Sequence, residues 1–259
     1  MQLTITDLPF RLRRKFYKIM GTRHVRTRYG VVMRANWQDA TFCMCYNGSY
    51  GTALSDLIAH HKDDFLFLDI GANQGLYSLL AARNPKCRQA YAFEPVAQTH
   101  GLLLDNIAAN ESQASITPVP VAVSSSTGTA TITLRTAHSG AASLEGTSLT
   151  QGGTVETIRT LDISAVDALL RPDGAILVKI DVEGHEAVVI GQLMMSQHQH
   201  RISAIFYEVD EAWHDPGALE AALRRGGFSQ FIRHGTGTHY DVLALRNAAG
   251  ASGGSSQIG

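Results

Sequence analysis

Two acidic residues follow apolar stretches at a spacing that is typical of nucleotide pockets. Asp69 lies after the apolar run 65–68 and just before a glycine-containing turn at 71–75, and Glu94 ends a second apolar stretch 25 positions later. In an open α/β sheet, glycines in such a turn let the backbone bend sharply and approach a ligand, and an acidic residue after the second strand binds ribose hydroxyls. The spacing predicts a ribose-containing ligand.

The turn itself indicates which ligand of this kind is bound. A pyrophosphate-binding turn reads G-x-G-x-x-G and presents a helix N-terminus to the phosphates, whereas this turn reads Gly71-x-Asn73-x-Gly75. A carboxylate at Asp69, two residues before the first glycine, repels phosphate and favours a cation. S-adenosylmethionine carries a sulfonium and an ammonium and no phosphate, so it fits this turn better than a dinucleotide. An ordinary strand–helix turn is the alternative interpretation.

A third group of polar residues ends another apolar strand. In the stretch 178–186, Lys179, Asp181, Glu183 and His185 follow Ala175-Ile176-Leu177. Open α/β sheets bind ligands at the carboxyl ends of their strands, and an unpaired charge in a buried strand is costly. We therefore expect these side chains to line the pocket. The alternative is an ion pair between Lys179 and a carboxylate that only braces the strand end.

Composition limits the class of protein. The chain has 259 residues, a net charge of −1, 44% hydrophobic residues and 17% charged residues, which predicts one large globular domain with or without an appendage. The net charge argues against a nucleic-acid partner. No apolar run approaches the roughly 18 residues of a membrane span, and no signal peptide is visible. Three cysteines favour reduced thiols in a cytoplasmic protein, with Cys43 and Cys45 on one face of a strand.

Basic residues are concentrated near the N-terminus. Eight of the 22 lysines and arginines lie in the first 28 positions, interleaved with apolar residues, which predicts an amphipathic basic helix over 7–20. A solvated helix face is one interpretation. The other is contact with an anionic substrate or with an acidic membrane surface.

The pattern of elements predicts an α/β fold with a mainly parallel sheet. We expect an N-terminal extension at 1–50 that ends in a β-ribbon, a catalytic domain at 51–246 and a disordered tail at 247–259. The loop 138–154 is rich in Gly, Ser and Thr and is expected to close over the pocket. Strands are expected at 24–35, 40–46, 65–69, 90–94, 116–123, 128–135, 175–181, 204–209 and 240–246, and helices at 51–61, 75–83, 97–110, 162–170, 184–195 and 217–225.

Several motifs together resemble the FkbM family of S-adenosylmethionine-dependent methyltransferases. They are LDIGANQGLYS, AFEP, VAVS, Leu161-Asp162 before a helix, and KIDVEGHE, and the resemblance covers residues 45–210. It implies a class I methyltransferase fold, Rossmann-like, with a seven-stranded sheet whose last strand is antiparallel. It also implies methyl transfer to a hydroxyl of a sugar or of a secondary metabolite, with S-adenosylhomocysteine as the product.

The resemblance also implies roles for particular residues. Asp181 is expected beside the methyl group. Two positions depart from the family pattern: Tyr50-Gly51 stands where members often have Tyr-Glu, and His185 stands where a small residue is usual. The positions expected to bind the cofactor are Asp69, Gly71, Ala72, Asn73, Gly75 and Leu76 around its methionine part, Glu94 and Pro95 at the ribose, and Val121 and Ala122 at the adenine.

An alcohol acceptor needs a base, because it is a poor nucleophile. We prefer Asp181 or Glu183, since His185 is expected one turn into a helix, and Glu208 at the end of the next strand is a further candidate. Lys179 is expected to orient a carboxylate. A divalent metal shared by Asp181, Glu208 and Asp210 is an alternative that we do not expect.

Other functions stay open at this point. The acceptor is expected to be a small hydroxylated molecule, with an anionic sugar or a glycolipid among the candidates, and the oligomeric state is undetermined. An N-methyltransferase is one alternative, although an Asn/Asp-Pro-Pro-aromatic motif is missing. An NAD(P)-dependent oxidoreductase or epimerase is disfavoured by the form of the glycine turn. A protein that binds the cofactor without turnover is the third alternative.

Overall fold

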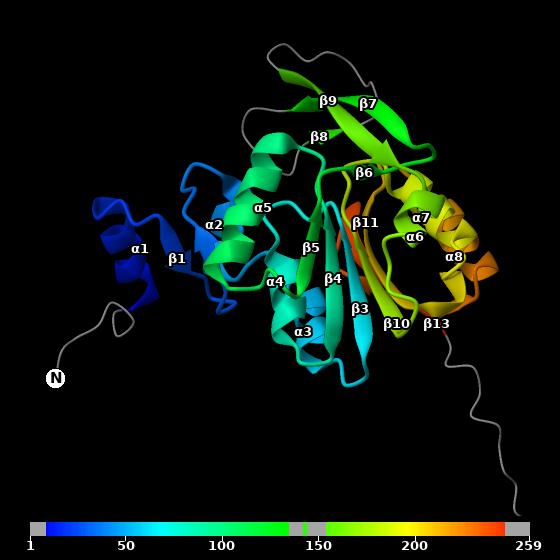
Figure 1. Ribbon diagram of the computed structural model, residues 1–259, viewed down its shortest axis with the longest axis horizontal. Coiled ribbons are helices and arrows are strands. Elements are labelled where there is room, and N and C mark those ends of the chain that lie inside the picture. The colour runs from blue at the N-terminus through cyan, green and yellow to red at the C-terminus, as the bar shows by residue number, and fades with distance from the viewer. Residues whose placement is uncertain (1–8, 135–141, 144–153, 247–259) are drawn as a thin grey trace, which may run out of the picture.

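The computed structural model describes residues 9–134, 142–143 and 154–246, and a seven-stranded sheet forms its centre (Figure 1). The strand order is β12-β13-β11-β10-β3-β4-β5, in which only β13 runs against its neighbours. This is the predicted mainly parallel sheet with an antiparallel last strand, so the expected fold class is confirmed. The strands are β3 (Phe65–Ile70), β4 (Cys87–Phe93), β5 (Ile116–Val119), β10 (Ala175–Ile180), β11 (Ile202–Asp210), β12 (Phe228–His234) and β13 (His239–Arg246).

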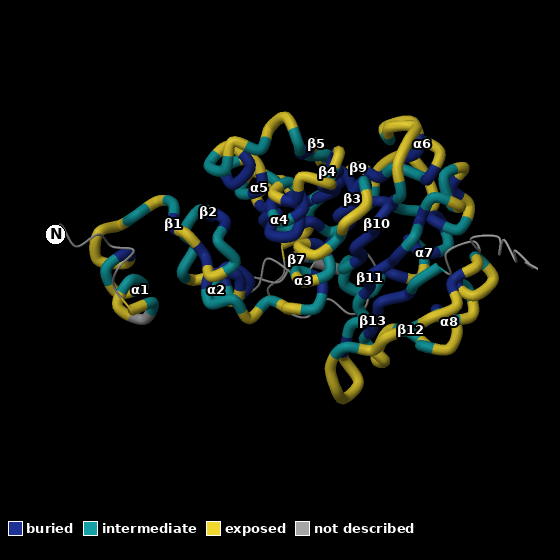
Figure 2. The backbone as a smooth tube through the Cα atoms, turned by 90° about the horizontal axis from the view of Figure 1, so that it is seen from below, coloured by how far each residue is buried: buried dark blue, intermediate teal, exposed yellow. Residues whose placement is uncertain are grey.

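Side chains of the central strands alternate between two apolar layers. Phe65 and Phe67 belong to one core cluster, whereas Leu66 and Leu68 belong to the other, as the period of two in a strand requires. All six residues of β3 are buried, and Figure 2 shows that burial is concentrated in the central strands. The first cluster includes residues of α3 (Ala53–His60), α4 (Leu76–Arg83) and α5 (Ala97–Ala109), and the second includes residues of α6 (Ile163–Asp167), α7 (Glu186–Met195) and α8 (Pro216–Arg225).

Helix ends follow the capping residues. The Asp162 side chain accepts a hydrogen bond from the Ala165 backbone N–H, so it caps α6 as expected. Helix α8 ends at Arg225, before Gly226-Gly227, and Gly227 has a φ of +93°. Helix α7 begins at Glu186, two residues later than expected, which leaves His185 outside it.

The N-terminal part contains α1 (Phe10–Ile19), the hairpin β1 (His24–Arg26) and β2 (Val32–Arg34), and α2 (Ala40–Asn47). The expected strand at 40–46 is wrong, because this segment is helical. Asp39 accepts a hydrogen bond from the Phe42 N–H, and Gly48 takes a left-handed conformation, so both ends are capped. Of the aromatic side chains in this segment, Tyr46 packs against Phe10 and Tyr17 of α1, and Phe42 packs against Trp37. Cys43 and Cys45 therefore lie on a helix.

A second, four-stranded sheet lies beside the carboxyl ends of the main strands (Figure 1). It contains β6 (Ala122–Val123), β7 (Gly128–Leu134), β8 (Ala142–Ser143) and β9 (Thr154–Leu161). The single strand expected at 116–123 is in fact β5 and β6 in two different sheets, separated at Pro120, which has no N–H to donate. Strands β9 and β12 were not predicted.

Two expectations fall largely outside the described residues. Of the expected loop 138–154, only 142–143 and 154 are described, and the tail 247–259 is not described. Among the described residues, no helix combines the length and the apolar character that crossing a bilayer requires.

Candidate active site

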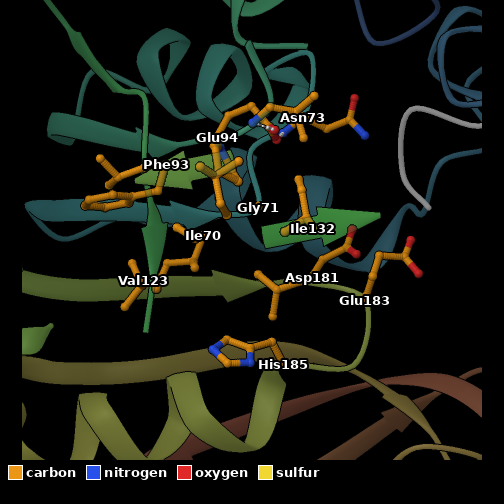
Figure 3. Close-up of a pocket in the computed structure, with 16 residues that line it drawn as sticks. Ile70, Gly71, Asn73, Phe93, Glu94, Val123, Ile132, Asp181, Glu183 and His185 are labelled. Carbon is orange, nitrogen blue, oxygen red and sulfur yellow. Dashed lines mark hydrogen bonds between the residues drawn. The ribbon is translucent and has the colours of Figure 1, made fainter. Parts of the chain in front are cut away.

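A hollow of about 630 Å³ opens at the carboxyl ends of β3, β4 and β10 (Figure 3). Glu94 and Asn73 lie on one side of it and His185 lies opposite, with Asp181 and Glu183 at a third edge. Much of the remaining wall is apolar, and both sheets contribute to it. These wall residues include Ile70, Phe93, Val121, Ala122, Val123, Ile132 and Ile158.

Glu94 is held in place by the turn after β3. Its Oε2 accepts a hydrogen bond from the Asn73 N–H at 2.9 Å, and its Oε1 accepts one from the Val96 N–H at 2.9 Å. Only 6% of the residue is exposed, and this burial raises the pKa of the carboxyl to about 7. Each oxygen still has a lone pair, so the carboxylate can accept further hydrogen bonds from the hollow.

The two glycines of the turn are required by close packing within the protein. Gly71 has a φ of +77°, and a Cβ there would lie 1.9 Å from the carbonyl oxygen of Asp181. Gly75 has a φ of +86°, and a Cβ there would lie 2.4 Å from Cδ1 of Leu103. Only Gly71 lines the hollow. Gly75 allows α4 and α5 to pack.

Asp69 lies beneath the hollow and does not line it. Its Oδ2 accepts hydrogen bonds from the Ser78 N–H at 3.0 Å and from the Ser78 hydroxyl at 2.6 Å, and its Oδ1 is 3.6 Å from the Lys179 ammonium. The residue has no exposed surface. Its position in β3 explains this, because it shares a face with Phe65 and Phe67 and points toward α4.

Lys179 balances the carboxylates at this end of the sheet. Burial disfavours its charged form, but Asp181 at 3.5 Å and Asp69 outweigh burial, and the pKa of Lys179 is raised. Its ammonium also donates to the Gly71 carbonyl. Lys179 thus contacts two carboxylates and ties β10 to the glycine turn, and its role in orienting a carboxylate stays a prediction.

A second hollow, of about 430 Å³, adjoins the first at Asp181. Tyr50, Tyr77 and Phe206 form an aromatic wall, and the Tyr50 hydroxyl donates to Oδ2 of Asp181 at 3.3 Å. The Tyr77 hydroxyl donates to the Tyr50 carbonyl at 2.7 Å. Asp181 therefore belongs to both hollows, and its side chain is held from the side of the second.

Two further carboxyls line the second hollow. Burial, with the Asp181 charge next, raises the pKa of Glu208 to about 7, and His239 lies within hydrogen-bonding distance, 2.6 Å from Nε2 to Oε1. The pKa of Asp241 is raised to about 6, first by burial and then by Asp181. Glu208 thus reaches the site as expected, whereas Asp210 does not line either hollow.

Glu183 and His185 line the first hollow. Glu183 has a φ of +52°, and its pKa is raised to about 8, first by burial and then by Asp181 and Glu208. A carboxyl with this pKa can take up a proton near neutral pH. His185 precedes α7, so its ring faces the hollow, and its Nε2 lies 3.1 Å from the Ser124 hydroxyl. The expectation that it lies one turn into a helix is wrong.

Ala72 and Leu76 line a smaller, adjoining hollow together with Asn73 and Lys179. The remaining residues expected at the cofactor, Pro95, Val121 and Ala122, line the main hollow. The structure therefore brings most of the expected residues to one connected region.

Sequence reasoning missed several residues of this region, among them Tyr50, Tyr77 and Glu186. Tyr50 and Tyr77 lie far from Asp181 along the chain. Glu186 accepts hydrogen bonds from the backbone N–H groups of Val182 and Gly184, each at 3.0 Å, and its other contact is His214. A signal existed for Glu186, since a carboxylate in the first turn of a helix commonly binds preceding N–H groups.

A search of curated protein sequences gives no match. The family model described as the methyltransferase FkbM domain matches residues 69–229, which is more than half of the chain. The chain belongs to the FkbM methyltransferase family.

Solved structures similar to this chain include three that are described as methyltransferases or as a methylase. The methyltransferase FkbM from Methylobacillus flagellatus KT is 17% identical with a TM-score of 0.48, and the match covers 72% of this chain and 44% of that longer one. A precorrin-6y C5,15-methyltransferase from Geobacter metallireducens GS-15 is 14% identical, with a TM-score of 0.42 and coverage of 75% and 86%. A ribosomal protein L11 methylase from Lactobacillus delbrueckii subsp. bulgaricus is 13% identical, with a TM-score of 0.45 and coverage of 78% and 80%.

The residues of this FkbM-family methyltransferase fit S-adenosylmethionine, the cofactor that the fold implies. A buried carboxylate at Glu94 faces the hollow with hydrogen-bonding capacity left, apolar walls suit a base ring, and Asp181 supplies negative charge near a sulfonium. The described residues contain no group of three or more His, Cys, Asp or Glu side chains arranged to hold a metal ion.

Proposed function

We propose that this methyltransferase transfers a methyl group from S-adenosylmethionine to a hydroxyl of a small molecule, a sugar or a secondary metabolite. The observation that carries this proposal is the position of the Glu183 carboxyl together with its raised pKa. Its carboxyl lies at the edge of the cofactor hollow beside Asp181, with its pKa raised to about 8. Hydroxyl acceptors require a base in this position, because an alcohol is a poor nucleophile at neutral pH.

The main hollow is the proposed cofactor site. Glu94 would bind the ribose hydroxyls through the lone pairs that its two backbone hydrogen bonds leave free. Val121, Ala122 and Val123 would contact the adenine, and the Gly71–Asn73 turn with Asp181 would hold the methionine part. S-adenosylmethionine supplies the electrophilic methyl group when it is bound.

The second hollow is the proposed acceptor site. It meets the cofactor hollow at Asp181, so an acceptor there can present an oxygen to the methyl carbon. Alignment of this kind contributes up to about 7–11 kcal/mol in favourable cases. Asp181, fixed by Lys179 and Tyr50, would orient the acceptor hydroxyl, and the Glu183 carboxylate would take its proton.

The residues that line the second hollow limit the classes of acceptor that fit it. Tyr50 and Phe206 offer aromatic faces, and Asp181, Glu208 and Asp241 offer carboxylate oxygens that accept hydrogen bonds from hydroxyls. Three carboxyls against one ammonium, Lys179, disfavour an anionic group in this space. We therefore propose a neutral or amino-bearing polyhydroxylated acceptor in preference to the anionic sugar considered from the sequence.

N-methylation is a second candidate, favoured by the same carboxyls. A protonated amine is attracted by Glu208 and Asp241 and by the aromatic rings beside them. A nicotinamide-dependent reaction is disfavoured by the glycine turn, and we do not propose it.

The test is transfer of a labelled methyl group to a panel of sugars, amino sugars and polyketide alcohols, with the product bond identified by mass spectrometry. The proposal expects an O-methyl product, and it expects Glu183→Gln to lower turnover by about 10²–10⁴-fold. Glu220→Gln is the matched control, because Glu220 lies on α8, outside both hollows, and forms an exposed ion pair with Arg224. An N-methyl product, or full turnover in Glu183→Gln, would overturn it.

A further inference from the structure

Helix α1 carries apolar side chains on the face that does not pack against the protein. Its inner face uses Phe10 and Tyr17, whose rings lie 4.4 Å and 6.5 Å from the ring of Tyr46 in α2. Leu12 and Ile19 nevertheless remain 50% and 83% exposed. These two side chains are thus not needed for the core.

The exposed residues form a mixed stripe along α1. Leu12, Lys15 and Ile19 follow one another at spacings of three and four, so they share a face, and all three are exposed. Lys18 is exposed beside them, and Met20, directly after the helix, is 62% exposed. No ion pair within the described part of the chain neutralises Lys15 or Lys18. Figures 1 and 2 place α1 at one end of the molecule, beyond α2.

Charge is segregated toward this end of the chain. Residues 8–38 contain nine of the 22 lysines and arginines and no aspartate or glutamate, which leaves 13 basic residues against 23 acidic ones elsewhere. A net charge of −1 therefore combines a strongly positive segment with an acidic remainder. Such a segment is attracted to an anionic surface that repels the rest of the molecule.

A shallow basic hollow adjoins the stripe. Lys18, Arg23 and Arg34 line it together with Trp37, and the Lys18 ammonium lies 5.6 Å from the centre of the Trp37 ring. Arg23 and Arg34 share Asp105, so part of their charge is balanced there. The hollow offers cations and an aromatic ring side by side, a combination that suits the headgroup region of a bilayer.

We propose that α1 docks this methyltransferase on an anionic lipid bilayer, with Leu12, Ile19 and Met20 inserted among the lipids and Lys15, Lys18 and Arg23 at the headgroups. A short helix with few apolar residues binds a neutral bilayer poorly, and cations alone bind only loosely, so stable docking needs both signals. The proposal does not depend on which acceptor is methylated.

The test is sedimentation of the full chain with vesicles of phosphatidylcholine, with and without phosphatidylglycerol. We expect binding to the mixed vesicles only. Lys15→Gln with Lys18→Gln should lower the partition coefficient by about 25-fold, since each cation near an anionic surface contributes about fivefold. Leu12→Ser with Ile19→Ser should lower it by about tenfold or more.

A matched control tests whether the effect is specific to α1. Met195→Ser with Arg225→Gln removes an apolar residue that is 65% exposed and an exposed cation from α7 and α8, and it should bind as the parent chain does. Circular dichroism would check that each variant folds. Binding to vesicles of phosphatidylcholine alone that equals binding to the mixed vesicles would overturn the proposal. Full binding by the Leu12 and Ile19 variant would also overturn it, because the segment would then be a site for polyanions in general.

Discussion

At the scale of single residues, the environment of each carboxyl separates binding from chemistry. Glu94 is fixed by two backbone N–H groups, and Asp181 is fixed by Lys179 and Tyr50. Burial raises the pKa of Glu183 to about 8, higher than the value of about 7 at Glu94. Its protonation therefore changes just above neutral pH.

Glu183 leads to a prediction about pH. If it accepts the acceptor's proton, it must be ionised, so turnover should rise as the pH passes through about 8. In Glu183→Gln the residual rate should lack this rise, whereas His185→Gln should keep it. A pH–rate profile from pH 6 to about 10 checks this. A profile for Glu183→Gln that rises as in the parent chain would contradict the assignment.

The same pKa predicts an effect on stability, with a defined sign. The folded state holds the Glu183 proton more tightly than the unfolded state, whose carboxyl titrates near its ordinary value of 4.5. Stability should therefore fall as the pH rises between these two values. Glu183→Gln should stabilise the fold above pH 8 by about 1 kcal/mol, a figure reduced for the solvent that reaches the carboxylate. Urea unfolding at pH 5 and pH 9 measures this, and a gain at pH 5 alone would contradict it.

Sequence reasoning placed residues well where they directly follow a strand. Glu94 and Asp181 could be located because the carboxyl ends of parallel strands meet at one edge. Asp69 was misplaced, since its position within β3 fixes which face it points to, and that face belongs to α4. Tyr50 could not be assigned, because its contact with Asp181 joins residues 131 positions apart.

At the scale of elements, the glycine turn after β3 is the tightest junction of the site. The turn passes so close to the end of β10 that a Cβ at Gly71 would meet the Asp181 carbonyl oxygen at 1.9 Å. This contact holds the glycine turn and Asp181, which both line the main hollow, in a fixed relation. The order of strands could be predicted from the alternation of elements, but this contact between two strand ends could not.

Gly71→Ala should therefore destabilise the protein by about 3 kcal/mol or more, through both the positive φ and the clash with backbone. Gly101→Ala is the matched control: Gly101 lies within α5, nothing lies within 4 Å of a Cβ there, and alanine should be neutral or stabilising by up to about 1 kcal/mol. Chemical denaturation measures both. Equal stability of the two variants would contradict this account of the turn.

The loop before α7 depends on Glu186. Its two oxygens bind the N–H groups of Val182 and Gly184, on either side of Glu183, and His214 contacts it from the segment before α8. Glu186→Gln presents an amide N–H to one of these donors and should cost about 2–4 kcal/mol. It should also lower turnover, because Glu183 loses its support. Thermal unfolding measures the loss of stability. Glu220→Gln, at an exposed ion pair, should lose less than about 0.5 kcal/mol of stability in the same experiment. A similar loss of stability in both variants would contradict this role of Glu186.

Errors at the element scale have local causes. The segment 40–46 resembles a strand in composition, but Asp39 and Gly48 cap it as a helix. The strand expected at 116–123 divides at Pro120 because the chain moves there from one sheet to the other. The caps at Asp39 and Gly48 are a local signal, whereas the change of sheet depends on packing partners that a local pattern does not contain.

At the scale of the whole molecule, the second hollow, with its three carboxyls, and the basic N-terminal segment belong to different parts of one chain. The net charge of −1 hides this division, since residues 8–38 contain no acidic residue. Composition alone argued against polyanionic partners for the chain as a whole. The position of α1 at one end of the fold makes its charge a separate feature from that of the active site (Figure 1).

The central claim is that the hollow beside Glu94 binds S-adenosylmethionine, and calorimetric titration with S-adenosylhomocysteine tests it most directly. NAD and NADP would be titrated in parallel. We expect tight binding of one S-adenosylhomocysteine per chain, weakened about 10–100-fold in Glu94→Ala, because hydrogen bonds to a charged group contribute about 1.5–3 kcal/mol. Absence of binding, binding of a nicotinamide cofactor instead, or unchanged affinity in Glu94→Ala would contradict the account.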